Sequence, residues 1–477
     1  MANNENSIKS SKAGRLAKNS ALFAIGELAS KVIIFLMVPL YTYSLSTEEY
    51  SISDLITTTV ALASPFFTLV IYEAVMRFTL DKDSDKQTIF SIGFWIFMVG
   101  SIMVGIISYV IFLFIPILKD YWLLFFIYYE VFNFFNIAAG FIKGLEHLKL
   151  FTIVGIINTF LMVLLNMLFL LYFKMGIEGY LWATIISTGF SSILIFVFER
   201  LDRYIISPTK IGKPDWTGML RYAMPMIPNS AMWWINNSSD RYLVTFVIST
   251  AANGIYSVAY KIPSIFSVLT SVFMQAWQIS VVDDFGTKEG TAFFNKTYDF
   301  YLRCCITVSS LLILSSELLA KFLFLNEFYT AWKFSIVLIL GFCFHSIAGF
   351  LGTVYTTAKK TNMLFVSTTI SAVFNIVFTF ILLKVFGVMG AAIATTLSYL
   401  LVYIIRRIDS RKYIDIESNL KLFAIEYMLI ITQIIAMLFD FGYLSTVLSV
   451  LLFLLIVCLN KEIPVRMFGM LLNKIKL

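Results

Sequence analysis

Apolar segments of about 20 residues follow one another along most of this chain, and short polar stretches separate them. A helix rises about 1.5 Å per residue, so roughly 20 apolar residues are enough to cross the hydrocarbon core of a bilayer. Fourteen segments have this length, and they begin near residues 16, 51, 89, 121, 151, 179, 219, 254, 298, 332, 363, 388, 422 and 443. The pattern predicts an all-α, polytopic membrane protein with about 14 transmembrane helices.

Composition supports this class. Of the 477 residues, 59% are hydrophobic and only 14% are charged, whereas soluble domains average about 45–50% and about 25%. Lipid is therefore the solvent for most of the chain. The four cysteines form no CxxC pair, so we expect neither a disulfide framework nor a metal site.

The Lys and Arg residues divide unequally between the polar connections. If the N-terminus is cytoplasmic, 28 of the 36 lie in inside segments and five lie in outside loops. Positively charged loops tend to stay in the cytoplasm, so we expect both termini there. The net charge of +7 then belongs to these loops and requires no nucleic acid partner. The three remaining cations, Lys31, Arg241 and Lys261, lie inside apolar spans.

Two stretches in the two halves of the chain resemble each other: LSTEEYSISDL at residues 45–55 and ISTAANGIYSV at residues 248–258. Further matches keep nearly the same offset: AGF at Ala139 and Ala348, Asn166 with Asn375, and GIEGYLWAT from Gly176 with GVMGAAIAT from Gly387. Each copy holds six spans, and an even number gives both copies the same orientation, which is a parallel repeat.

We therefore expect two six-helix lobes related by an axis along the membrane normal, followed by two additional helices. The expected boundaries are residues 1–198 for the first lobe, 199–215 for a cytoplasmic linker, 216–412 for the second lobe, and 413–477 for the additional helices and tail. Transporters built from such repeats bind substrate near the bilayer midplane, between the lobes.

Cations inside spans are the first candidates for a binding site. A Lys or Arg at the centre of an inserted helix costs about 2.5–3.5 kcal/mol, so it should face a cavity or a partner. Lys31, Arg241 and Lys261, together with Arg77 at the end of the second span, are candidates for holding an anionic head group. None of the three intramembrane cations recurs in the other half at the repeat offset, which favours a site for one asymmetric ligand over a scaffold role.

Acidic residues in the same spans leave a second interpretation open, in which the charges pair structurally. Glu27 precedes Lys31 by four residues and Glu73 precedes Arg77 by four, the spacing of an ion pair on one helix face. Asp240 adjoins Arg241 and could pair with another helix. The candidates for ion coupling or charge pairing are Glu27, Glu73, Glu130 and Asp240.

Neutral polar and aromatic residues in the spans are candidates for contacts with sugar hydroxyls and rings. Interhelical hydrogen bonds and packing are the alternative for each of them. These residues are Trp233, Trp234, Asn236, Asn237, Gln275 and Gln278.

The stretch NSSDRYLVTFVISTAANGIYSVAYKIPSIF, residues 237–266, resembles Wzx-type polysaccharide repeat-unit flippases, the carriers of O-antigen and capsule units. These belong to the multidrug, oligosaccharidyl-lipid and polysaccharide exporter superfamily. LSTEEYSISDL resembles the family's first external turn, although Ser51 stands where the family usually has Gly. The resemblance implies alternating access driven by a proton or sodium gradient, without a cofactor. It also implies cavity cations on the first, second and eighth helices, where Lys31, Arg77 and Lys261 stand.

From the residues and the resemblance together we expect a flippase of the bacterial cytoplasmic membrane. Its substrate would be an undecaprenyl-pyrophosphate-linked oligosaccharide, and a polysaccharide polymerase and a chain-length regulator would be its protein partners. Two alternatives stay open: another exporter of the superfamily, for peptidoglycan or teichoic-acid precursors or for drugs, and a membrane polysaccharide polymerase. Cationic candidates speak against a drug exporter. The short external loops leave no room for a catalytic domain, so we expect no enzyme and no catalytic residues.

Overall fold

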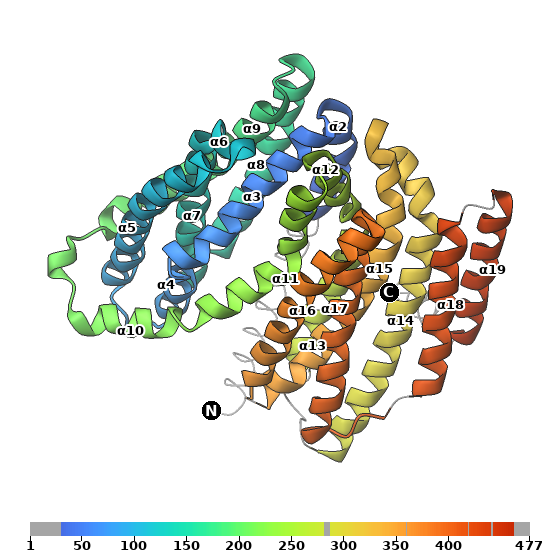
Figure 1. The fold of residues 1–477 in the computed structure, drawn as a ribbon. Coiled ribbons are helices and arrows are strands. Elements are labelled where there is room, and N and C mark those ends of the chain that lie inside the picture. The colour runs from blue at the N-terminus through green and yellow to red at the C-terminus, as the bar shows by residue number, and fades with distance from the viewer. Residues whose placement is uncertain (1–29, 281–286, 359, 418, 440–441, 462–477) are drawn as a thin grey trace, which may run out of the picture. The chain divides into compact units, whose positions relative to one another are not determined.

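The computed structural model describes residues 30–280, 287–358, 360–417, 419–439 and 442–461, and all regular elements assigned there are helices (Figure 1). Nine of the described helices are long and apolar enough to cross a membrane, and the bent pair α3 and α4 makes a tenth. Each predicted span contains one helix or two consecutive helices, which confirms the all-α polytopic fold. The chain divides into two compact units, residues 1–234 and 235–477, and each is described by itself.

Unit 1, residues 1–234, packs its helices around an apolar core where α4, α5 and α7 meet. Val75 of α4, Phe90 of α5 and Phe141 of α7 are fully buried, and the two Phe rings lie 4.8 Å apart. The elements are α2 (Val38–Ser44), α3 (Thr47–Phe67), α4 (Ile71–Thr79), α5 (Lys86–Leu113), α6 (Pro116–Lys119), α7 (Trp122–Gly144), α8 (Leu148–Asn166), η1 (Met167–Tyr172), α9 (Gly176–Phe198), η2 (Leu201–Tyr204), η3 (Pro208–Lys210) and α10 (Lys213–Ala223). α10 packs against α4, so the predicted linker and the helix after it lie in this unit.

The second predicted span is broken into two helices. α3 and α4 meet at 63°, and the residues at the junction, Leu69 and Val70, have φ angles of 54° and 53°. These left-handed values cost about 1–2 kcal/mol per residue outside glycine. Pro65 lies in the last turn of α3, and a Cβ on Gly100 of α5 would lie 2.1 Å from the Phe67 carbonyl oxygen. Because Gly100 has no side chain, α5 can lie against the Phe67 carbonyl at the end of α3, next to the bend between α3 and α4.

Unit 2, residues 235–477, is arranged around α15. α15 packs against α13, α14 and α17, and 78% of its most apolar stretch is buried inside the protein. The elements are the C-terminal part of α11 (Met226–Val247), then α12 (Thr250–Ala259), α13 (Lys261–Ser280), α14 (Lys288–Leu323), η4 (Asn326–Ala331), α15 (Trp332–Thr357), α16 (Asn362–Phe386), α17 (Val388–Asp409), η5 (Ser410–Lys412), α18 (Leu420–Leu438) and α19 (Tyr443–Leu459).

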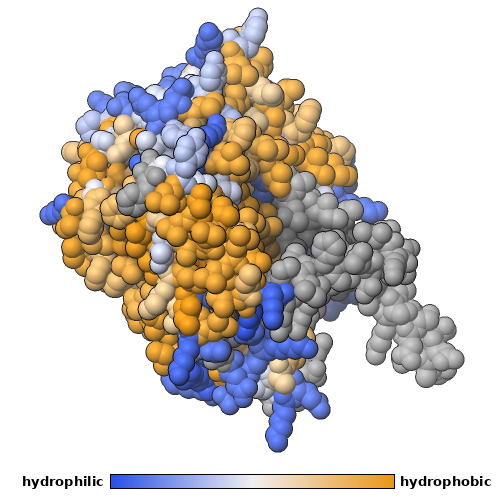
Figure 2. All heavy atoms as spheres, turned by 90° about the vertical axis from the view of Figure 1, so that its right-hand side faces the viewer, coloured by the Kyte–Doolittle hydropathy of each residue, from blue (hydrophilic) through white to orange (hydrophobic). Residues whose placement is uncertain are grey.

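The two additional helices, α18 and α19, form a hairpin on α14. The Gln433 amide of α18 accepts a hydrogen bond from the Ser310 hydroxyl of α14 at 2.7 Å and donates one to the Ser449 hydroxyl of α19 at 3.0 Å. The outer face of the hairpin is apolar, with Met428 68% and Phe439 68% exposed, and Figure 2 shows the apolar band on this side of the molecule. Lipid is the environment that such a surface requires.

Structural details recur at the predicted repeat positions and support the duplication. Ser46 caps α3 and Ser249 caps α12, and each hydroxyl accepts a backbone N–H from three residues ahead at 3.1 Å. Gly176 and Gly387 both adopt a left-handed backbone, with φ angles of 56° and 57°. The resemblance between residues 45–55 and 248–258 therefore reflects two equivalent helix starts.

Candidate functional site

A carboxylate lies fully buried in unit 2, on α11. Asp240 is 0% exposed. Its Oδ2 accepts hydrogen bonds from the hydroxyls of Tyr256 at 2.7 Å, of Thr395 at 3.0 Å, and of Tyr260. The backbone N–H of Arg241 donates to Oδ1 at 3.0 Å. These donors offset the cost of removing the carboxylate from water.

Residues from α11, α12, α16 and α17 form one hydrogen-bonded group around Asp240. Tyr256 and Tyr260 stand four residues apart, so their rings lie on one face of α12 and its C-terminal end, with centroids 5.4 Å apart. Thr395 comes from α17, and its hydroxyl accepts a hydrogen bond at 3.2 Å from the side-chain amide of Asn375 on α16. We name the five residues Asp240, Tyr256, Tyr260, Asn375 and Thr395 the Asp240 cluster.

The Asp240 cluster has the chemistry of a site for a proton or an alkali cation. It combines one carboxylate with hydroxyl and amide oxygens, which are hard ligands. Among the residues that the structure describes, no three His, Cys, Asp or Glu side chains come together as a metal site would require. A cation at Asp240 would therefore be one that carboxylate and neutral oxygen atoms can bind.

Two of the predicted head-group cations, Arg241 and Lys261, each adjoin a residue of the Asp240 cluster in the sequence. The Arg241 guanidinium lies over the Tyr260 ring, 4.9 Å from its centroid. Lys261 follows Tyr260 directly and begins α13. Both side chains are half-buried. In unit 2, Arg241 thus contacts a tyrosine that donates to the buried carboxylate, and Lys261 is the next residue in the chain after that tyrosine.

Lys31, the third intramembrane cation, lies in unit 1 on the helix Ser30–Ser44, where its side chain is half-buried. Its predicted partner Glu27 lies outside the described residues.

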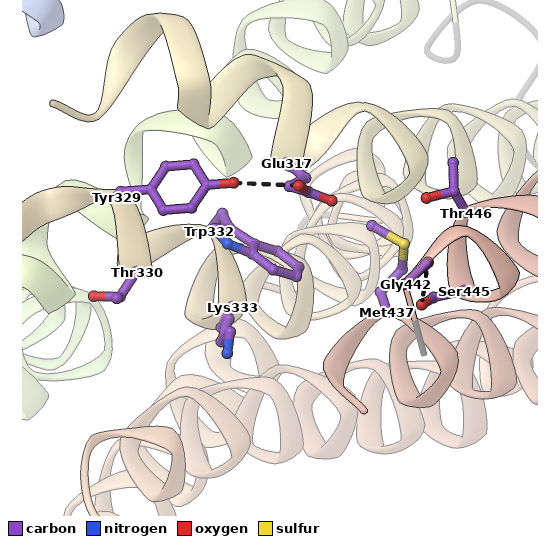
Figure 3. A pocket seen from close by; sticks show the side chains of 9 residues that line it. All are labelled: Glu317, Tyr329, Thr330, Trp332, Lys333, Met437, Gly442, Ser445 and Thr446. Atoms are coloured by element: carbon purple, nitrogen blue, oxygen red, sulfur yellow. Dashed lines mark hydrogen bonds between the residues drawn. The ribbon is translucent and has the colours of Figure 1, made fainter. Parts of the chain in front are cut away.

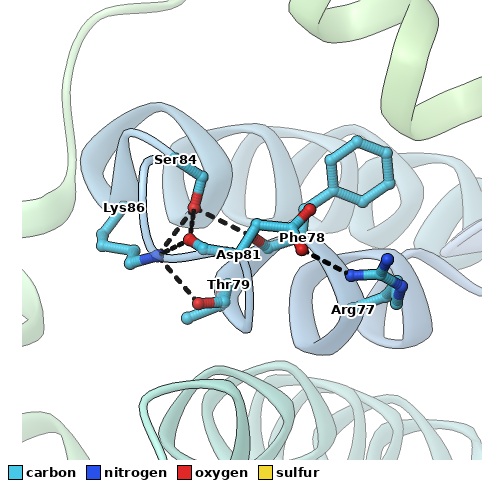
Figure 4. A network of polar contacts seen from close by, with 6 residues as sticks. All are labelled: Arg77, Phe78, Thr79, Asp81, Ser84 and Lys86. Atoms are coloured by element: carbon cyan, nitrogen blue, oxygen red, sulfur yellow. Dashed lines mark hydrogen bonds and ion pairs between the residues drawn. The ribbon is translucent and has the colours of Figure 1, made fainter.

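Arg77 lies at an exposed turn. Its guanidinium forms an ion pair with Asp81 at 2.8 Å, and 51% and 59% of the two side chains are exposed (Figure 4). The spacing indicated a pair with Glu73, but α4 ends at Thr79 and the chain turns, so that the Asp81 carboxylate pairs with Arg77. The Lys86 ammonium closes the same turn by donating to the carbonyls of Thr79 at 2.8 Å and Asp81 at 2.5 Å.

The two candidate asparagines make hydrogen bonds between helices of unit 2. Asn236 is 2% exposed and accepts a hydrogen bond from the Ser371 hydroxyl at 3.1 Å. Asn237 accepts one from the Tyr399 hydroxyl at 2.7 Å. These contacts join α11 to α16 and α17, which is the interhelical alternative that the sequence left open.

The candidate tryptophans lie at the end of unit 1. The Trp234 indole donates to the Thr58 carbonyl at 2.8 Å, and Trp233 is 36% exposed. Gln275 and Gln278 belong to α13, but their side chains lie outside the described part of the chain.

Glu130 lies in an apolar groove of unit 1. The Ser101 hydroxyl donates to its Oε2 at 2.9 Å, while its Oε1 is buried with no hydrogen-bond partner among the described residues. The groove has a volume of about 710 Å³ and runs between α5 and α7, past Trp122 and Phe126. A carboxyl group in these surroundings remains a candidate for carrying a proton.

Arg406 is one of the 28 Lys and Arg residues expected in cytoplasmic segments, and it is buried. It is 4% exposed at the end of α17. Its guanidinium donates to the Ala348 carbonyl at 2.9 Å, the Ser367 hydroxyl at 3.1 Å and the Thr368 hydroxyl at 3.3 Å. Arg406 therefore joins α15, α16 and α17 instead of facing solvent.

Comparison with known proteins assigns the chain to a family. A family model described as "Polysaccharide biosynthesis protein" matches residues 16–278, which is more than half of the chain. The chain belongs to the polysaccharide biosynthesis protein family. The matched residues include Asp240, Arg241 and Lys261. No curated protein matches the sequence.

Solved structures share the fold of this polysaccharide biosynthesis protein. Lipid II flippase MurJ in an inward closed conformation is 16% identical, with a TM-score of 0.71 over 93% of this chain and 99% of that chain. An inward-facing multidrug resistance MATE family transporter of the MOP superfamily is 13% identical, with a TM-score of 0.64 over 82% and 97%. MATE in complex with MaL6 is also 13% identical, with a TM-score of 0.59 over 83% and 95%. The polysaccharide biosynthesis protein therefore has the fold of a membrane flippase and transporter superfamily.

Proposed function

We propose that this chain is a flippase that moves undecaprenyl-pyrophosphate-linked oligosaccharide units from the inner to the outer leaflet of the bacterial cytoplasmic membrane. The observation that carries the proposal is that Arg241 and Lys261 directly follow Asp240 and Tyr260 in the chain, and that these two residues form a buried hydrogen bond. A pyrophosphate is an anion that cannot cross hydrocarbon unaided, and two cations can compensate its charge in a hydrated passage. The lipid tail can remain in the bilayer meanwhile.

The matched family and the shared fold support the class of this proposal. The neighbour with a TM-score of 0.71 is titled a flippase of lipid II, and we infer by analogy of fold that this chain also carries a lipid-linked substrate. The family description adds polysaccharide synthesis as the process that would use the substrate.

We further propose that Asp240 binds the coupling cation, a proton or a sodium ion. When a cation neutralises Asp240, the neighbouring Arg241 guanidinium is available to an anionic head group. When the cation leaves, the carboxylate regains its charge and competes with the head group for the positive side chains. The position of Arg241 over Tyr260, itself a donor to Asp240, allows this exchange over a short distance.

Cells that depend on this chain for surface polysaccharide provide the test. Arg241→Gln and Lys261→Gln should each abolish surface polymer and leave lipid-linked units in the inner leaflet. Lys384→Gln is the matched control, because Lys384 also lies over an aromatic ring, that of Phe380 at 4.2 Å, at the end of α16. Full surface polymer in both site variants, at normal protein levels, contradicts the head-group assignment. Accumulation of a peptidoglycan precursor in place of oligosaccharide units contradicts the substrate class.

A further inference from the structure

Two hollows that share lining residues lie at one end of unit 2, where four helix ends meet, and Figure 3 shows the smaller of them. α14 ends at Leu323 and α15 begins at Trp332, while α18 ends at Leu438 and α19 begins at Tyr443. The hollows have volumes of about 180 and 370 Å³, and both are lined by Glu317, Met437, Gly442 and Thr446. Spanning helices end where the membrane meets water, so we name the two hollows together the interface cleft.

The charged side chains that line the interface cleft leave one net positive charge. The Glu317 carboxylate pairs with the Lys321 ammonium at 3.0 Å and accepts a hydrogen bond from the Tyr329 hydroxyl at 3.2 Å. Lys333 is the remaining charged residue of the lining, and its ammonium lies 5.9 Å from the centroid of the Trp332 ring. Because Glu317 and Lys321 compensate each other, the charge of Lys333 determines which ligand the cleft prefers.

Deeper in the span, the lining of the interface cleft becomes apolar. Leu314 and Leu318 of α14 contribute to it, together with Met437 of α18. Leu314 precedes the end of α14 by nine residues, roughly 13 Å along the helix axis. On the α19 side, Ser445 and Thr446 bring hydroxyl groups to the lining. A ligand in the cleft would therefore meet a cation and hydroxyls at one end and aliphatic side chains at the other.

We propose that the interface cleft binds an anionic phospholipid of the surrounding leaflet, with the phosphodiester beside Lys333 and an acyl chain along Leu314 and Leu318. A phosphodiester carries one negative charge and compensates the net charge of the lining. Lys333 also lies in the first turn of α15, where the helix dipole favours an anion. Tyr329 and Trp332 are the aromatic residue types that concentrate at the membrane interface.

The bound lipid would connect the α18–α19 hairpin to α14 and α15. The cleft lies on the side that the predicted topology places outside, so the lipid would come from the outer leaflet. The proposal does not depend on the flippase assignment, because it concerns a lipid that stays in place and not one that is transported.

Thermal unfolding of the purified full chain in detergent tests the proposal with three probes. They are phosphatidylglycerol, diacylglycerol with the same chains, and inorganic phosphate. We expect phosphatidylglycerol to raise the Tm of the wild type by about 3 °C or more, and the other two probes to have much smaller effects. Lys333→Gln should lose most of the response, as should Thr446→Trp, which fills the cleft without a change of charge. Lys384→Gln should keep it.

Three outcomes would overturn the proposal. Lys333→Gln could respond like the wild type, diacylglycerol could match phosphatidylglycerol, or inorganic phosphate alone could give the full shift. If Lys333→Gln does not fold, native mass spectrometry of the wild type decides instead. One anionic phospholipid should then be retained per chain in preference to diacylglycerol, and retention without that preference contradicts the proposal.

Discussion

Tyr256 donates a hydrogen bond of 2.7 Å to the Asp240 carboxylate, and both side chains are 0% exposed. The bond joins α12 directly to α11. A carboxylate in this position depends on its hydroxyl donors while it is charged and needs a cation to become neutral. The proposed ion coupling at Asp240 therefore depends on these hydroxyl donors, and the variants below test them.

Replacement of Tyr256 by Phe should destabilise the protein by about 1 kcal/mol, because the buried carboxylate loses one donor. Tyr443→Phe is the control, since Tyr443 is 95% exposed at the start of α19, and it should cost almost nothing. In an Asp240→Asn background, where no charge needs the donor, the cost of Tyr256→Phe should fall to less than half. Thermal unfolding of the four variants measures this, and equal costs in both backgrounds contradict the assignment.

Replacement of Arg406 by Lys should destabilise the protein by about 2 kcal/mol. The guanidinium makes three directed hydrogen bonds to α15 and α16, and a single ammonium cannot reproduce that planar geometry. Arg411→Lys, at an exposed position of η5 nearby in the chain, should leave the Tm unchanged. A Tm for Arg406→Lys equal to that of the control would show that Arg406 does not hold these helices together.

Gly387→Ala should cost about 1–3 kcal/mol, because its φ of 57° and ψ of −145° lie in a region that other residues avoid. A Cβ there would meet no atom within 4 Å, so the cost comes from the backbone alone. Gly349→Ala is a matched control in the interior of α15, where a Cβ also meets nothing within 4 Å and alanine should be slightly favourable. Denaturation curves that show no difference between the two variants contradict a backbone requirement for glycine at position 387.

The predicted orientation can be tested with single cysteines in a variant that lacks the four native ones. Lys210, at the end of η3, should be protected in intact cells, and Lys174, before α9, should react with a membrane-impermeant maleimide; both are exposed. The excess of cations in the inside segments is the reason for this expectation. Labelling of Lys210→Cys and protection of Lys174→Cys would reverse the assigned topology.

Hydropathy predicts the spans well because lipid imposes the same requirement on every one of them. It does not predict the break between α3 and α4, since Leu69 and Val70 are residues that normally avoid a left-handed backbone. The break depends on Gly100 of α5, whose close approach to the Phe67 carbonyl is a tertiary contact. Hydropathy does not predict the burial of Arg406 either, because its hydrogen-bond partners lie on α15 and α16.

Some residues of the candidate site can be recognised from the sequence alone, and others only from the structure. Asp240, Arg241 and Lys261 stand out in the sequence because a charge in an apolar span is costly. Thr395 and Asn375 do not, since hydroxyl and amide side chains are common in spans, and Thr395 lies 155 residues from Asp240. The spacing of Tyr256 and Tyr260 was the one local signal, because two tyrosines four residues apart share a helix face.

A transport assay in proteoliposomes tests whether this chain flips lipid-linked oligosaccharide and whether Asp240 couples that movement to an ion gradient. Purified undecaprenyl-pyrophosphate-linked oligosaccharide would be reconstituted with the wild type or with Asp240→Asn, and a membrane-impermeant oxidant of sugars would report the exposed fraction over time. We expect a proton or sodium gradient to speed exposure at least tenfold for the wild type, a difference of about 1.4 kcal/mol in activation free energy, and not for Asp240→Asn. No movement by the wild type in either gradient, or equal gradient-driven movement by Asp240→Asn, would contradict it.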